Sequence, residues 1–125
     1  LLVEDEELVL EMATEILEQL GYVVISASSP AVALAASASC SDPIDLLITD
    51  VIMPEMSGRE LADQITARCP QVKCLFMSGY PADFIANRGV LDAGINFLQK
   101  PFSLDTLAAR VRAALDGGRA PAAGS

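Results

Sequence analysis

Hydrophobic positions in this chain fall into two kinds of run. Short runs rich in Leu, Ile and Val stop at a charged or small polar residue, which is typical of strands buried on both faces. The strands predicted in this way cover residues 1–3, 23–25, 46–49, 74–77 and 95–98. Because apolar and polar residues do not alternate within them, we expect both faces of the sheet to be covered.

Between the predicted strands, apolar residues recur every three or four positions, which favours amphipathic helices. The predicted helices cover residues 8–20, 30–39, 58–68, 81–88 and 104–116, of which 81–88 has the weakest pattern. Ser29, Ser57 and Ser103 are suited to be N-caps of three of them. Gly21 fits the left-handed residue that ends the first. Strands and helices alternate, so the pattern predicts an α/β fold of the (βα)5 type with a parallel sheet.

The length of 125 residues fits one domain, which we place at residues 1–116. Residues 117–125 are rich in Gly, Ala and Pro and are interpreted as a flexible tail or linker.

The net charge of −9 argues against nucleic acid or an anionic membrane as a direct partner, because both require basic patches. No apolar run approaches the roughly 20 residues needed to cross a bilayer. Three cysteines without C-x-x-C spacing, and no histidine, favour reduced thiols in a cytoplasmic protein.

Polar residues stand at the carboxyl ends of four predicted strands. Glu4 and Asp5 follow the first, Asp50 the third, Ser78 the fourth and Lys100 the fifth. Parallel strands bring these ends to one edge of a sheet, where ligands bind in open α/β folds. We therefore expect three acids, a hydroxyl and an ammonium group to meet there.

Clustered carboxylates repel one another unless a cation lies between them, and Mg²⁺ prefers carboxylate, phosphate and water oxygens. A carboxylate is also a nucleophile that forms an aspartyl phosphate. Phosphoryl transfer depends mainly on positioning and charge neutralisation, which Mg²⁺ and Lys100 would supply. Ser78 would donate a hydrogen bond to a phosphoryl oxygen.

Four motifs in this order resemble the receiver domains of two-component response regulators. They are Val3-Glu4-Asp5-Glu6, Asp50-Val51-Ile52-Met53-Pro54 with Ser57-Gly58, Ser78-Gly79, and Lys100-Pro101-Phe102. The resemblance implies a flavodoxin-like three-layer sandwich whose five-stranded parallel sheet has the order 2-1-3-4-5.

The resemblance also implies roles for single residues. Asp50 would be the phosphoacceptor, and Glu4, Asp5, Asp50 and the backbone carbonyl of Ile52 would bind Mg²⁺. Lys100 would contact the phosphoryl group, and Ser78 and Phe97 would form the conformational switch. Two positions depart from the commonest family residues: Glu4 is often Asp, and Ser78 is often Thr.

Residues 76–80 and 89–102 are most similar to receivers fused to hybrid sensor histidine kinases. The resemblance therefore implies phosphoryl transfer from a histidine kinase or a histidine phosphotransfer domain. This domain would not be an enzyme beyond its own phosphorylation and dephosphorylation, although its parent protein would be a histidine kinase. The fourth helix, fifth strand and fifth helix would form the face for partners or for a homodimer.

Each site residue also has a simpler reading. Glu6 and Glu7 suit the acidic start of a helix, Asp50 and Ser78 suit turns, Lys100 suits an exposed strand end, and Phe97 suits the core.

An aspartyl-phosphate phosphatase is disfavoured because Ile52 stands where such enzymes have a second Asp. A flavin carrier is disfavoured because residues 4–7 would repel its phosphate. A receiver that works without phosphorylation is the last alternative, yet every key position is present.

Overall fold

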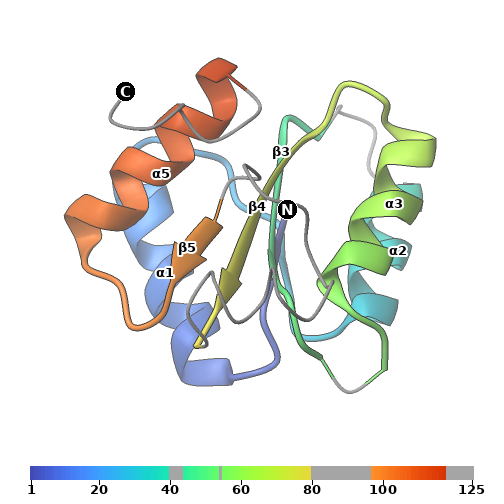
Figure 1. The fold of residues 1–125 in the computed structure, drawn as a ribbon, viewed down its shortest axis with the longest axis horizontal. Helices are drawn as coiled ribbons and strands as arrows, with labels where there is room; N and C mark the ends of the chain where they lie inside the picture. Colours follow the sequence, from blue (N-terminus) through green and yellow to red (C-terminus); the bar gives the residue numbers. More distant parts are fainter. Residues whose placement is uncertain (40–43, 54, 80–96, 118–125) are drawn as a thin grey trace.

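Five parallel strands form a single sheet in the order β2-β1-β3-β4-β5, as the family resemblance predicted (Figure 1). The computed structural model describes residues 1–39, 44–53, 55–79 and 97–117. The strands are β1 Leu2–Val3, β2 Ser26–Ala27, β3 Leu46–Asp50, β4 Lys73–Ser78 and β5 Phe97–Gln99. β3 lies at the centre of the sheet and is buried along its whole length. The strand that carries Asp50 is therefore shielded from solvent.

Helices cover both faces of the sheet and complete three layers. They are α1 Glu7–Gln19, α2 Pro30–Ser39, α3 Gly58–Arg68 and α5 Leu104–Gly117. α1 and α5 lie on one face, and α2 and α3 lie on the other (Figure 1). Each face has its own buried cluster: Leu75 and Leu107 belong to one, and Leu47 and Leu61 to the other. The predicted (βα)5 architecture is thus confirmed for the described elements.

Local capping explains where the helices begin and end. The Oγ atoms of Ser29, Ser57 and Ser103 accept backbone N–H groups three residues later, at 3.1–3.2 Å. These bonds satisfy donors that the first helical turn leaves unpaired. Gly21 has φ of 96° and follows the C-cap residue of α1, in the left-handed region that glycine adopts without cost. All four predicted caps are confirmed.

The position of β2 was predicted incorrectly. The β-branched residues 23–25 were expected to form the strand, but Ser26–Ala27 pairs with β1, and Val23 is 95% exposed. Ser26 lies opposite Leu2, and the carbonyl of Ile25 accepts the Leu2 N–H at 2.8 Å, so pairing with β1 involves only the last of the β-branched residues. Strand propensity depends on such pairing and packing, and the β-branched composition alone did not locate the strand.

The helix at 8–20 is confirmed as α1, but its buried face differs from the periodic residues that predicted it. Ala13 and Leu17 are buried, whereas Leu8 is 82% and Met12 43% exposed. The α1 surface that follows the acidic motif therefore presents apolar side chains to solvent.

Three expectations fall partly or wholly outside the described residues. They are the helix at 81–88, the first two residues of the strand at 95–98, and the tail from residue 118 onward. α5 includes Gly117, one residue beyond its predicted end. Within the described ranges, no helix combines the length and hydrophobicity that a membrane span requires.

Candidate functional site

Asp50 is the last residue of β3, so its side chain lies at the carboxyl edge of the sheet. The following residue, Val51, donates its N–H to the carbonyl of Met77 on β4 at 2.8 Å. Asp50 is 7% exposed. The chain therefore leaves the strand with the Asp50 carboxylate held at the edge yet largely shielded from bulk water.

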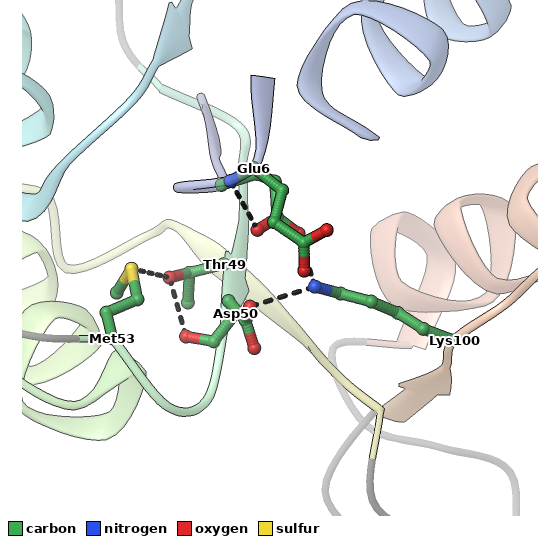
Figure 2. A network of polar contacts seen from close by, with 6 residues as sticks. Glu6, Thr49, Asp50, Met53 and Lys100 are labelled. Carbon is green, nitrogen blue, oxygen red and sulfur yellow. Dashed lines mark hydrogen bonds and ion pairs between the residues drawn. The ribbon is translucent and has the colours of Figure 1, made fainter. Parts of the chain in front are cut away.

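Glu4 follows β1, the neighbour of β3, and is fully buried. Its Oε1 accepts the backbone N–H of Glu6 at 3.1 Å (Figure 2). The Glu4 N–H donates to the carbonyl of Ala27, which extends the pairing of β1 with β2 by one residue. A buried carboxylate requires compensation by hydrogen bonds or a positive charge.

Lys100 follows β5 and brings that charge to both acids. Its Nζ lies 2.5 Å from Oε2 of Glu4 and 2.9 Å from Oδ2 of Asp50 (Figure 2). The Lys100 backbone N–H donates to the carbonyl of Ser78, which anchors the lysine beside the end of β4. β1 and β5 are not adjacent in the sheet, so the long lysine side chain is what joins their ends.

The site perturbs the ionisation of both partners in this ion pair. Burial raises the pKa of the Glu4 carboxyl from 4.5 to about 7, and the Lys100 ammonium only partly offsets this effect. Burial alone would lower the pKa of Lys100, but its bonds to Glu4 and Asp50 outweigh burial and raise it. Lys100 is therefore positively charged, while at Glu4 the effect of burial outweighs that of the neighbouring ammonium.

Asp5 completes a group of three carboxylates. Ligand oxygens of Glu4, Asp5 and Asp50 all lie within 4.8 Å of one another, and Asp5 is exposed on the solvent side. Three carboxylates beside one ammonium carry an excess of two negative charges when all are ionised. A divalent cation would balance that excess, and an all-oxygen donor set suits Mg²⁺. The residues present therefore fit the predicted metal.

The other predicted site residues lie around this group. Ser78 ends β4 and is 1% exposed, while Ile52 lies two residues beyond Asp50 and is 49% exposed. Phe97 begins β5, pairs with Phe76 and packs partly buried against the core on the α2–α3 side. Their assigned roles stay predictions.

Two features of the site were not expected from the sequence. The first is the contact between Glu4 and Lys100, because Lys100 was expected to serve the phosphoryl group alone. The second is a set of contacts behind Asp50 made by Thr49 and Gly58. The sequence signals for these contacts were weak. Thr49 is a polar residue inside the apolar β3 segment, and Gly58 is the glycine that begins α3.

The family model for the response regulator receiver domain matches residues 1–112. The chain belongs to this family. Sensor kinase CckA of Brucella abortus is 39% identical over 116 residues, which are 93% of this chain and 12% of that protein. The response regulator receiver protein CpdR of the same organism is 34% identical over 107 residues, 86% of this chain and 88% of that protein. Thus the receiver spans a small part of one relative and most of the other.

Solved structures agree with this assignment. The receiver domain from hybrid histidine kinase CckA is 35% identical, has a TM-score of 0.76, and covers 91% of this chain and 95% of that chain. A response regulator receiver protein from Sinorhizobium medicae is 28% identical with a TM-score of 0.78, covering 94% and 93%. The predicted family, its hybrid-kinase likeness and its fold are therefore confirmed, and the chain is a receiver domain of two-component signalling.

Proposed function

We propose that this receiver domain accepts a phosphoryl group on Asp50 from a phosphohistidine, in a reaction that depends on Mg²⁺. One observation carries the proposal: the Asp50 carboxylate ends the central strand within a group of three carboxylates, and Lys100 lies 2.9 Å from it. The site thus combines a nucleophile with a cation that can stabilise a phosphoryl group.

In the proposed step, an Asp50 carboxylate oxygen forms a bond to phosphorus as the phosphorus–nitrogen bond of the donor breaks. The electron pair of that bond stays on the imidazole, which takes a proton from solvent. Lys100 then holds a phosphoryl oxygen, and the Ser78 hydroxyl donates a hydrogen bond to another. Lys100 already contacts Asp50 from just beyond the end of β5, so it needs only a short shift to follow the new negative charge.

Glu4, Asp5, Asp50 and the carbonyl of Ile52 are the residues proposed to hold Mg²⁺. The bound ion would neutralise charge between the carboxylates and the phosphoryl oxygens. Support comes from the three clustered carboxylates, whose ligand oxygens all lie within 4.8 Å of one another. Such a domain is a phosphoacceptor rather than a catalyst for a separate substrate.

The proposed partner is a histidine kinase or a histidine phosphotransfer domain in the cytoplasm, with a hybrid histidine kinase as the parent protein. Similarity to sensor kinase CckA supports this context. A donor protein must bring its imidazole to Asp50 and thereby cover the start of α1. Leu8 and Met12, one turn apart on α1, expose apolar surface there, which fits a protein partner.

We also propose that phosphorylation reaches a second surface through Ser78 and Phe97. The phosphoryl group would draw the Ser78 hydroxyl toward it and leave room for the Phe97 ring to turn inward. β5 and α5 would then change as part of a face that binds a partner or a second copy. Support comes from Lys100, whose backbone bond to Ser78 connects the end of β5 to the end of β4.

The proposed function is tested by incubating the domain with acetyl phosphate and Mg²⁺ and measuring intact mass. The wild type should gain one phosphoryl group, which hydroxylamine should remove as expected of an acyl phosphate. Asp50→Asn should gain none. Asp45→Asn is the matched control, because Asp45 is exposed just before β3, at the opposite end of that strand. Equal labelling of the wild type and Asp50→Asn would refute the phosphoacceptor assignment.

A further inference from the structure

The main-chain carbonyl of Asp50 has a buried hydroxyl beside it. Thr49 is fully buried, and its Oγ1 lies 3.0 Å from the Asp50 carbonyl oxygen and 4.0 Å from Sδ of Met53 (Figure 2). The hydroxyl has one proton, and a carbonyl oxygen is a much stronger acceptor than a thioether. Thr49 therefore donates to Asp50, and Met53 packs against the other side of the hydroxyl.

The same carbonyl is approached closely by the first residue of α3. A Cβ at Gly58 would collide with the Asp50 carbonyl oxygen and would lie 3.1 Å from Cγ2 of Thr49. The Gly58 N–H donates to the carbonyl of Val51 at 2.7 Å, which holds α3 against this segment. Only a residue without a side chain permits this approach.

We propose that Thr49 is a positioning residue for the phosphoacceptor, acting with Gly58 on the Asp50 carbonyl. The hydroxyl and the α3 backbone together fix the peptide plane between Asp50 and Val51. That plane sets the direction in which the Asp50 side chain leaves the strand, and hence its alignment with Lys100 and an incoming phosphorus. The inference rests on the proposed function, because it concerns the same Asp50 carboxylate.

If Thr49 served packing alone, the effects of Thr49→Val and Thr49→Ser would be ranked differently. Threonine suits a buried strand because it is β-branched, and valine has the same shape and the same preference. If packing alone mattered, Thr49→Val would be harmless and Thr49→Ser, which lacks the methyl group, would be the damaging change. The positioning role predicts the reverse order of effects on the phosphorylation rate.

The experiment measures the rate of phosphorylation by acetyl phosphate, at a temperature where thermal unfolding shows every variant to be folded. Thr49→Val should react about 3- to 10-fold more slowly, as expected for the loss of one hydrogen bond. Thr49→Ser should restore the rate to near that of the wild type. Thr14→Val is the matched control, since the Thr14 Oγ1 on α1 is buried without a hydrogen-bond partner. It should leave the rate unchanged.

Gly58→Ala gives an independent test of the same contact. Pushing the Asp50 carbonyl aside should slow phosphorylation by at least about tenfold, because displacement by about 1 Å costs up to 100-fold. Because both changes act on one carbonyl, the double variant with Thr49→Val should be less impaired than the product of the single effects. Fully multiplicative effects would contradict a shared target.

The outcomes separate this inference from the proposed function. If the wild type is phosphorylated and Thr49→Val reacts at the same rate, the positioning role is wrong while the phosphoacceptor assignment stands. Failure of the wild type to accept phosphate would overturn both. If Gly58→Ala does not fold, the comparison of Thr49→Val with Thr49→Ser still decides the question.

Discussion

Lys100 lies closer to Glu4 than to Asp50: its Nζ is 2.5 Å from the Glu4 carboxylate and 2.9 Å from that of Asp50. The only fully buried acid of the site thus shares the lysine with the proposed phosphoacceptor. Because Glu4 is buried away from water, any change in its charge alters its electrostatic interaction with Lys100. The ionisation of Glu4 should therefore influence the whole domain.

Raising the pH should destabilise the metal-free domain. Burial raises the pKa of Glu4 from 4.5 to about 7, so the folded domain retains a proton that the unfolded chain has released. Where the unfolded state binds fewer protons, the free energy of unfolding falls as pH rises. The Glu4 contribution should fall by roughly 3 kcal/mol between about pH 4.5 and 7. Urea unfolding in EDTA at several pH values measures this change.

Glu4→Gln is the control for this pH dependence, because it keeps the shape of the side chain and cannot ionise. Its free energy of unfolding should vary less between pH 4.5 and 7 than that of the wild type. Identical pH profiles for the two proteins would show that Glu4 is not the titrating group.

Asp5 should contribute to Mg²⁺ binding, whereas Glu7 should not. Asp5 belongs to the group of three carboxylates, while Glu7 lies in the first turn of α1, where an acid favours the helix. In isothermal titration calorimetry, Asp5→Asn should weaken Mg²⁺ binding by at least about tenfold, equivalent to about 1.4 kcal/mol. Glu7→Gln should bind like the wild type. The opposite ranking would refute the proposed ligand set.

Leu8 should matter for transfer from a protein donor. Its side chain is 82% exposed on the first turn of α1, two residues after the acidic motif ends. Leu8→Arg should slow phosphotransfer from a phosphorylated histidine phosphotransfer domain by about tenfold, as for an interface contact worth about 1.4 kcal/mol. With acetyl phosphate, which needs no docking surface, the rate should change little.

Val23→Arg is the matched control for this surface. Val23 is 95% exposed and precedes β2, so it lies toward the opposite edge of the sheet from Asp50. The Val23→Arg variant should accept the phosphoryl group from the histidine phosphotransfer domain at the wild-type rate. Equal loss in both variants would point to a general effect of added charge rather than to docking on α1.

Ser78 should be needed for the conformational response to phosphorylation rather than for the phosphorylation reaction itself. Its position at the end of β4, joined to the Lys100 backbone, suits a hydroxyl that follows the phosphoryl group. Beryllofluoride with Mg²⁺ should change hydrogen exchange in β5 and α5 of the wild type, and Ser78→Ala should lose most of that change. Ser37→Ala on α2 should respond like the wild type. A full response in Ser78→Ala would contradict the switch.

The sequence alone determined the features that depend on short-range chemistry. N-caps at Ser29, Ser57 and Ser103 and the turn at Gly21 follow from bonds or backbone angles within a few residues. The shared edge of the carboxylates followed from the parallel arrangement, since every strand of such a sheet ends on the same side. These predictions needed no knowledge of distances between remote segments.

Only the tertiary structure decided which groups at that edge contact one another. β2 pairs with β1 through Ser26 and Ala27, opposite Leu2 and Val3, rather than through the β-branched run before them. Lys100 reaches Glu4 across two intervening strands, and Gly58 approaches the Asp50 carbonyl because α3 packs back onto the end of β3. Such contacts depend on register, side-chain reach and packing between segments far apart in the chain, and no local sequence pattern encodes those quantities.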